Sequence, residues 1–521
     1  MFQASSRLAS SGGSSRLPAT ALRLPFHYTI STWNRQYRTT ALCNDVAQDY
    51  DTICEMAASN LRFGPGATSE IGFDLKHNLF PTHSATPHVV VFTDPNVRQM
   101  PVLDTLLESF DRADIRHVTL YDQCRVEPND VSFQHAIRFL RSLSYDAVVA
   151  VGGGSVIDTA KAANLYATYP EADFYDFVNP PIGKGRNVPM TSSLPPLVAI
   201  PTTAGTGSET TGVAIFDDTA THSKTGIASR QLKPVLGIVD PNNTETLPTK
   251  VATYSGLDVL CHAIESYTAL PYNKRPRPES PILRPTYQGS NPFADHWSLF
   301  ALRTCARYLP EAIDPKRRDT IEARTKMLLA SSAAGMGFGN AGVHLCHGMS
   351  YPISSQAKEY YGYERTITAI EKRGGQDGLK TRLPHDNASY DTLDLSYHPL
   401  VPHGLSVIVS APAVFEFTGE ADPERHSICA RILSEARGDN SKAESSYRDA
   451  GAWLADEIRQ LCNRLQVPLG LRQFGYSEDD IPSLVEGTLP QHRVVKICPR
   501  QPIGRQELEC LFLAAMDEKQ D

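Results

Sequence analysis

Several signals that mark common protein classes are missing from this sequence. No apolar run approaches the roughly 18 residues that a membrane-spanning helix needs. The ten cysteines include no Cys-x-x-Cys pair, which argues against a zinc ribbon or a dithiol redox motif. We therefore expect reduced, mostly buried thiols in an intracellular protein that does not insert into a membrane.

Acidic residues and lysine are absent from the first 44 residues. This stretch holds five arginines and many serines, without the continuous apolar core of a secretory signal. The arginines are Arg7, Arg16, Arg23, Arg35 and Arg38. Such a composition is typical of a mitochondrial transit peptide, which we expect over residues 1–45. An N-terminal tail without a targeting role is the alternative.

The remaining chain is acidic and long enough for two domains. The net charge is −8 over 521 residues, so the part after residue 44 carries −8 − 5 = −13. An acidic balance disfavours nucleic acid as the main partner. Composition is that of an ordinary globular protein, with 41% hydrophobic and 21% charged residues, and the length favours two domains.

Short apolar runs alternate with helical patterns between residues 46 and 240. We expect strands at 88–93, 116–121, 146–151, 197–200, 213–216 and 236–239, with helices at 97–113 and 131–143. This alternation predicts an α/β domain with a doubly wound parallel sheet.

The Gly-x-Gly-x-x-Gly fingerprint is absent, but two other loops suit a phosphate ligand. The strand at 146–151 runs into Gly152-Gly-Gly-Ser155 and then a helix. Glycines let a ligand approach the backbone, and a helix N-terminus offers free N–H groups to a phosphate. Pro201–Glu209 is rich in hydroxyls and suits a pyrophosphate or a nicotinamide amide. A tight turn and a flexible turn are the respective alternatives.

Beyond residue 241 the pattern becomes helical. Helices are expected at 291–310, 324–334, 423–435 and 445–465, which predicts an all-helical domain over 241–521. The first of them carries an apolar stripe that we interpret as core, formed by Trp297, Phe300, Ala301, Cys305 and Tyr308. Residues 356–398 are polar and without period, and are expected to be a surface insertion.

Asp258 and His262 are four residues apart in a helical segment, so both side chains lie on one face. Such a pair can share a divalent metal, or it can simply be hydrogen bonded. His347 and His403 each precede a glycine, where the backbone can pack closely against another element. Taken singly, each is more typical of a hydrogen-bonded core histidine than of a metal ligand.

In combination, these motifs resemble the iron-containing (group III) alcohol dehydrogenase family. The segments that carry the resemblance are Gly152–Ser155 with Asp158 and Lys161, Pro201–Glu209, Gly256–Tyr267, Ala334–Asn340, His347–Met349 and Pro402–Gly404. The resemblance implies a dinucleotide-binding α/β domain over 46–240, a helical catalytic domain over 241–521 and a metal in the cleft between them. It further implies Fe(II) or Zn(II) on Asp258, His262, His347 and His403.

The cofactor implied by the resemblance is NAD. The implied contacts are Asp94, Gly153, Gly154, Ser155, Asp158, Thr203, Thr206, Thr211 and Lys224. Asp94 follows a strand, where its carboxylate can bind ribose hydroxyls and repel a 2′-phosphate. An Asx turn before Pro95 is the alternative for Asp94.

Four further segments resemble a mitochondrial subgroup of the family that exchanges hydride between hydroxy acids and oxoacids. They are Pro271–Pro292, His344–Ile353, His398–Gly404 and Gly487–Gln491. The resemblance implies a tightly bound NAD, 4-hydroxybutyrate or a similar donor, 2-oxoglutarate as acceptor, and succinate semialdehyde and 2-hydroxyglutarate as products. We expect a homo-oligomer. A NAD-dependent alcohol dehydrogenase that releases NADH and a catalytically silent binding protein are the alternatives.

Three further residues are candidates for contact with substrate. Tyr351 stands where family members often hold a histidine, so a proton-relay role is not carried over, although a phenol can donate to substrate. Arg275 or Arg284 is our hypothesis for binding a substrate carboxylate, because that segment continues from the metal-binding helix. A solvated basic loop is the alternative. His344 is interpreted as structural.

Overall fold

The structure is a computed structural model that describes residues 49–80, 87–189, 193–314, 321–359, 361, 393, 399–439 and 449–517. The predicted transit peptide and most of the predicted insertion at 356–398 lie outside these residues. From Asp49 onward the described residues belong to one compact unit.

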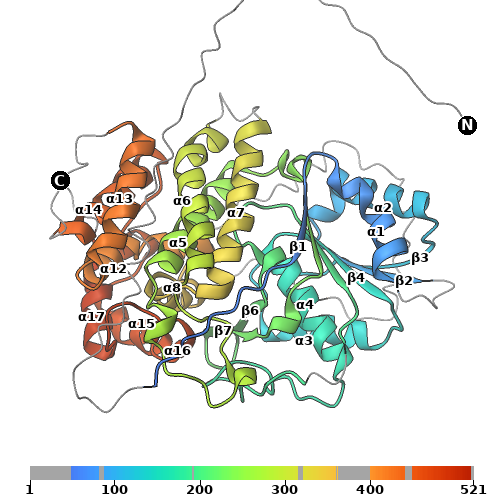
Figure 1. The fold of residues 1–521 in the computed structure, drawn as a ribbon, viewed down its shortest axis with the longest axis horizontal. Helices are drawn as coiled ribbons and strands as arrows, with labels where there is room; N and C mark the ends of the chain where they lie inside the picture. The colour runs from blue at the N-terminus through green and yellow to red at the C-terminus, as the bar shows by residue number, and fades with distance from the viewer. Residues whose placement is uncertain are drawn as a thin grey trace, which may run out of the picture. The chain divides into compact units, whose positions relative to one another are not determined.

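A six-stranded parallel sheet forms the part of this unit nearer the N-terminus (Figure 1). Its order is β1-β8-β5-β4-β2-β3. The strands are β1 (Asn60–Phe63), β2 (His88–Phe92), β3 (His117–Tyr121), β4 (Ala147–Gly152), β5 (Leu197–Pro201) and β8 (Leu236–Val239). The chain moves one way from β2 to β3 and the other way to β4, so the order reverses at β2. The predicted doubly wound α/β part is confirmed.

Helices cover both faces of the sheet because alternate strand residues are apolar on both sides. Val90, Phe92 and Val148 face α3 (Asp130–Arg141) and α4 (Gly154–Thr168). Val89, Val91 and the other alternate residues face α1 (Ile71–Asp74) and α2 (Pro101–Ala113). The central strands β2, β4, β5 and β8 are thereby buried, and the ends of these strands are left for a ligand.

One expected strand belongs to a different sheet. β6 (Val213–Asp218) pairs antiparallel with β7 (Ser223–Ala228) in a two-stranded sheet, so its predicted place in the parallel sheet is wrong. The reason is the short return between the two strands, which permits only antiparallel pairing. β1 and β7 had no strand prediction.

The part nearer the C-terminus is helical and shares one hydrophobic core (Figure 1). Its α-helices are α5 (Thr249–Thr268), α6 (Pro292–Ile313), α7 (Ile321–Ala341), α8 (Leu345–Ser355), α11 (His403–Ile408), α12 (Ala411–Thr418), α13 (Pro423–Arg437), α14 (Ala450–Arg464), α15 (Ile481–Thr488), α16 (His492–Val495) and α17 (Arg505–Ala514). The predicted helical class is confirmed; the boundary near residue 240 stays a prediction.

The apolar stripe on α6 is core for only part of its length. Ala301 and Cys305 are buried, whereas Phe300 is 41% exposed, so its assignment to the core is wrong. Phe300 precedes Ala301 by one position, about 100° around the helix, which turns it away from the core. Trp297 and Tyr308 are half-buried against the core.

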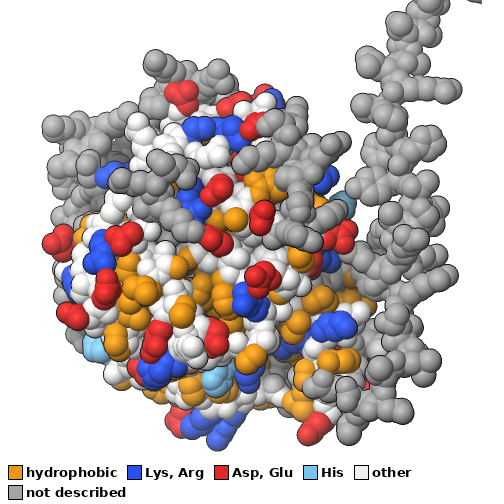
Figure 2. Space-filling view, turned by 90° about the vertical axis from the view of Figure 1, so that its left-hand side faces the viewer, with side chains coloured by type: hydrophobic (Ala, Val, Ile, Leu, Met, Phe, Trp, Pro, Cys, Tyr) orange, Lys and Arg blue, Asp and Glu red, His pale blue; other side chains and the backbone are white. Residues whose placement is uncertain are grey.

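The helical face at the left of Figure 1 carries mixed charge. Figure 2 shows acidic and basic side chains interspersed with apolar ones, without a continuous basic surface on that face. Within the described ranges, no helix is both long and apolar enough to span a bilayer.

Candidate active site

Helix α5 positions the first two candidate metal ligands. Its central and C-terminal turns are buried on all sides, and Asp258 and His262 project from one face of it. Phe338 of α7 stacks flat on the His262 ring, with centroids 3.9 Å apart and planes 9° apart. This stacking holds the imidazole in one orientation.

His347 and His403 reach the same place from two other helices. His347 lies in the first turn of α8, and His403 begins α11. A Cβ at Gly404 would lie 1.9 Å from the carbonyl oxygen of Tyr254. Glycine therefore lets α11 cross α5 closely enough to bring His403 beside Asp258.

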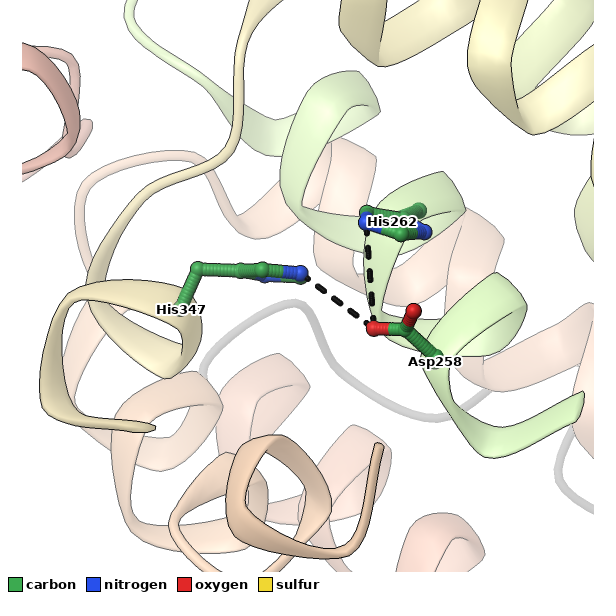
Figure 3. A group of neighbouring side chains, drawn as sticks. All are labelled: Asp258, His262 and His347. Carbon is green, nitrogen blue, oxygen red and sulfur yellow. Dashed lines mark ion pairs between the residues drawn. The ribbon is translucent and has the colours of Figure 1, made fainter. Parts of the chain in front are cut away.

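Three imidazoles surround one carboxylate oxygen. Nε2 of His347 lies 3.4 Å from Asp258 Oδ1, and Nε2 of His262 and of His403 each lie 3.7 Å from it. Figure 3 shows the His262 and His347 rings turned toward that oxygen. Two ligands about 2.1 Å from one tetrahedral metal would be about 3.4 Å apart. The spacing therefore fits a shared ion.

The lack of hydrogen-bond partners for two of these atoms also indicates a shared ion. Asp258 Oδ1 and His347 Nε2 are both buried and have no hydrogen-bond partner. Buried polar atoms without partners are costly, and a cation between them would satisfy both. The one-carboxylate, three-imidazole set thus fits a divalent metal such as zinc or ferrous iron. Ligand atoms of Asp258, His262 and His347 all lie within 4.8 Å of one another.

Glu265 orients His347 from one turn further along α5. Its Oε2 accepts a hydrogen bond from His347 Nδ1, which leaves Nε2 directed at Asp258. Its Oε1 accepts from the backbone N–H groups of His344, Cys346 and His347 at 2.8–3.3 Å. A carboxylate behind a ligating imidazole fixes its tautomer and raises its basicity.

Burial and charge set the protonation of the cluster. Burial lowers the pKa of His262 to about 3 and also lowers that of His403, so both are neutral ligands. Burial acts against ionisation of Asp258, but the three histidines outweigh it and hold its pKa well below the usual value. For His347, burial lowers the pKa, yet Glu265 and Asp258 raise it well above normal. A metal would replace that proton.

One cleft of about 120 Å³, partly open to solvent, joins this cluster to the N-terminus of α4. All four candidate metal ligands and Tyr351 line it, as do six of the nine predicted cofactor residues. Those six are Gly154, Ser155, Asp158, Thr206, Thr211 and Lys224. Gly153, Thr203 and Asp94 do not line it, although Gly153 and Asp94 follow β4 and β2, where the strand order reverses.

Several predicted cofactor residues have structural partners. Asp158 accepts hydrogen bonds from Ser208 Oγ (2.5 Å) and the Ile215 N–H (3.0 Å). The buried Lys161 donates to Ser208 Oγ (2.7 Å). These bonds fasten the loop after β5 and strand β6 to α4. Lys224 is paired with Glu127 and, at 3.2 Å, with Asp217.

Asp94 forms the turn that was its alternative interpretation. Its Oδ1 accepts from the N–H groups of Asn96 (2.8 Å) and Val97 (3.0 Å). Its ribose contact stays a prediction.

The two arginines predicted to bind substrate lie elsewhere. Arg275 donates to the carbonyl oxygen of Tyr287, and Arg284 pairs with Asp51 (2.9 Å) and Glu55 (3.1 Å). Neither lines the cleft. The structure therefore offers no contact that supports their predicted role, because the segment turns from α5 toward the residues before β1. His344 is structural in its contacts, with Nε2 3.1 Å from Thr268 Oγ1.

Glu265, which contacts a candidate ligand, and the cleft residues Glu127 and Arg493 had no functional prediction from the sequence. Glu265 follows His262 by three positions on the same helix face, a spacing that could have signalled it. Glu127 has a positive φ of 51° after β3, and Arg493 lies on the short helix α16. Neither carries a local signal in the sequence.

Comparison with known proteins places the sequence in one family along most of its length. The model of the family described as "Iron-containing alcohol dehydrogenase" matches residues 58–241. "Fe-containing alcohol dehydrogenase family, C-terminal" matches residues 286–362 and 392–516. The chain belongs to the iron-containing alcohol dehydrogenase family and is an oxidoreductase.

Particular relatives are closer still. The chain is 47% identical to the mitochondrial hydroxyacid-oxoacid transhydrogenase of Rattus norvegicus, over 96% of each chain. It is 48% identical to the protein of that name from Homo sapiens, over 89% of this chain and 90% of that one. The mitochondrial localisation predicted from the N-terminal composition is confirmed.

A solved structure supports the fold. "1,3-propanediol oxidoreductase" is similar with a TM-score of 0.67 and 26% identity, covering 89% of this chain and 100% of that one.

Proposed function

We propose that this enzyme is a hydroxyacid–oxoacid transhydrogenase with a bound nicotinamide cofactor. Hydride leaves the carbinol carbon of a short hydroxy acid such as 4-hydroxybutyrate, which becomes succinate semialdehyde. It is then delivered to 2-oxoglutarate, which becomes 2-hydroxyglutarate. Two electrons and two protons are exchanged in total, so the cofactor ends as it began. The main observation that supports this function is that one cleft contains both the Asp258 cluster and the N-terminus of α4.

The metal would be held by Asp258, His262, His347 and His403, with Glu265 orienting His347. When bound, it supplies a Lewis acid that polarises the substrate oxygen. NAD would be held by the loops after β2, β4 and β5, and supplies the hydride acceptor. Ligands of doubly wound sheets bind where the strand order reverses, which here is between β2 and β4.

The residues of the chain do the positioning. Free N–H groups at the start of α4 suit the pyrophosphate, and a Cβ at Gly154 would lie 2.5 Å from Thr206 Cγ2, so the two loops touch there. Lys224 and Glu127 form a charged wall of the cleft, and Asp217 pairs with Lys224 at 3.2 Å. Phe338, Val343 and Val213 form apolar walls that exclude water from the reacting carbon.

A single assay tests this function. Purified enzyme is mixed with 4-hydroxybutyrate and 2-oxoglutarate without added NAD, and 2-hydroxyglutarate is followed. We expect steady formation of 2-hydroxyglutarate and of equimolar succinate semialdehyde. Continuous NADH production from 4-hydroxybutyrate plus free NAD, without any oxoacid, would instead select a NAD-dependent alcohol dehydrogenase.

We also expect a homo-oligomer. Light scattering of the purified enzyme measures its molar mass and so the number of subunits.

A further inference from the structure

Arg493 is a buried cation in the cleft whose bonding is incomplete. Its Nη2 donates to the phenol oxygen of Tyr351 at 3.0 Å. Its guanidinium carbon lies 4.7 Å from the centre of the Tyr287 ring. Its Nη1 is buried and has no hydrogen-bond partner. One nitrogen of this planar donor therefore has no partner among the described residues.

The charge of Arg493 is also uncompensated. Among the described residues no carboxylate forms an ion pair with Arg493, and the groups that raise its pKa against burial are Tyr287 and Tyr351. Burial raises the pKa of Tyr287 to about 12, so that phenol is neutral. By contrast, the largely buried Arg284 and Arg425 each pair with at least one carboxylate. Burying an unpaired cation is costly, so an anionic ligand would be strongly favoured here.

The position of Arg493 relative to the metal ligands suits a substrate. Tyr351 lies on α8 one turn after His347, and both line the cleft together with Arg493. A short molecule whose hydroxyl or carbonyl oxygen faces the Asp258 cluster would therefore have its other end on the Arg493 wall.

We propose that Arg493 binds the carboxylate of the hydroxy-acid and oxoacid substrates, and that Tyr351 positions it through the Nη2 bond. This inference rests on the proposed function for its substrates. The guanidinium offers parallel N–H groups that match a carboxylate, which lysine cannot reproduce. It makes Arg493, rather than Arg275 or Arg284, the group that distinguishes acids from neutral alcohols.

The test compares three variants with wild type as metal-loaded holoenzymes. They are Arg493→Gln, Arg493→Lys and a control, Arg500→Gln. Arg500 is partly exposed and packs on Phe417 outside the cleft. Binding of 2-oxoglutarate is measured by calorimetry. The loss of a charge-assisted fork predicts a Kd that is about 10- to 100-fold higher for Arg493→Gln. Arg493→Lys should show a smaller increase, and Arg500→Gln should match wild type.

Kinetics give the second measurement. The ratio of kcat/KM for 4-hydroxybutyrate to that for the neutral 1,4-butanediol should fall at least about 10-fold in Arg493→Gln. Tyr351→Phe should lower the ratio by less, because it removes one supporting hydrogen bond. A ratio that is unchanged in Arg493→Gln, with wild-type metal content and melting temperature, overturns the inference. If Arg493→Gln does not fold, a wild-type Kd and ratio in Arg493→Lys would overturn it.

The two proposals fail separately. If wild type binds 2-oxoglutarate through Arg493 but transfers no hydride to it, the proposed function fails and the carboxylate site stands. If wild type is an active transhydrogenase and Arg493→Gln keeps the same Kd for 2-oxoglutarate, the carboxylate site fails and the function stands.

Discussion

Glu265 accepts a hydrogen bond from Nδ1 of His347, and Nε2 of the same ring lies 3.4 Å from Asp258 Oδ1. The two residues are on α5 and α8, so the contact joins the helices that carry three of the candidate ligands. Glu265 is fully buried and also accepts three backbone N–H groups at the start of α8. It therefore fixes both the ring and the helix that carries the ring.

Replacing Glu265 with Gln should weaken metal binding. The amide keeps the shape but removes the charge that makes His347 a strong ligand, so we expect a metal affinity lower by about 10- to 100-fold. The measurement is metal retained during dialysis against increasing chelator. Glu486→Gln, which breaks only the exposed pair with Arg505, is the matched control. Equal retention in both variants would contradict the role given to Glu265.

Removal of the metal should abolish activity and lower stability together. Chelation leaves His347 cationic between Glu265 and Asp258 and deprives the fold of a ligand that binds only the native state. We expect the melting temperature to fall on chelation and to recover with Fe(II) or Zn(II), whichever restores turnover. Both are followed in one chelator titration. Full transhydrogenase activity in protein shown to be metal-free would refute the metal role of this cluster.

The substitution Gly153→Ala tests cofactor binding without disturbing the packing of the fold. A Cβ there would lie 3.4 Å from Thr203, an ordinary contact, so Gly153→Ala should fold and melt as wild type does. If a phosphate approaches the N-terminus of α4, the new methyl group obstructs it. We expect NADH affinity to fall by roughly tenfold, equivalent to about 1.4 kcal/mol.

Gly154→Ala provides the contrast. Its Cβ would lie 2.5 Å from Thr206 Cγ2, so both the melting temperature and the NADH affinity should fall. Fluorescence titration with NADH and thermal unfolding measure the two effects. Undiminished NADH affinity in Gly153→Ala would place the cofactor phosphates elsewhere.

The sequence predicts more of the metal cluster than of the substrate site, and the reasons are physical. Asp258 and His262 are neighbours on one helix, so their spacing alone predicts that they lie together. His403 depends on the close approach that Gly404 permits, a signal visible as a His-Gly pair. Glu265 has a spacing on α5 that could have signalled it, but the sequence does not show that it is buried and bonded to His347.

The position of an arginine in the sequence did not predict whether it lies in the cleft, as Arg493, Arg275 and Arg284 show. Arg275 and Arg284 follow the metal-binding helix in sequence, yet Arg284 is paired with Asp51 and Glu55 from the beginning of the described chain. Arg493 comes from α16, and only the packing of α16 against α8 places it in the cleft. Long-range packing, which no periodicity encodes, decides which arginine can meet a substrate.

Arg425 should be one of the strongest determinants of stability in the helical part. Its guanidinium makes two hydrogen bonds to Asp295 (2.7 and 2.9 Å), one to the Tyr267 carbonyl (2.6 Å), and lies 4.5 Å from the centre of the Tyr267 ring. It thereby ties α13 to α5 and α6. Arg425→Met leaves Asp295 as an uncompensated charge, and we expect a loss of about 3–5 kcal/mol in the free energy of unfolding.

The matched control is Arg472→Met. Arg472 pairs with Glu478 (2.7 Å) and Asp517 (2.9 Å) at the surface, where all three side chains are well exposed. Exposed pairs contribute about 0–1 kcal/mol, so this variant should unfold at nearly the wild-type denaturant concentration. Urea unfolding of both variants, with metal bound throughout, makes the comparison. Similar midpoints for the two variants would contradict this prediction. They would mean that the buried pair with Asp295 contributes no more to stability than an exposed pair at the surface.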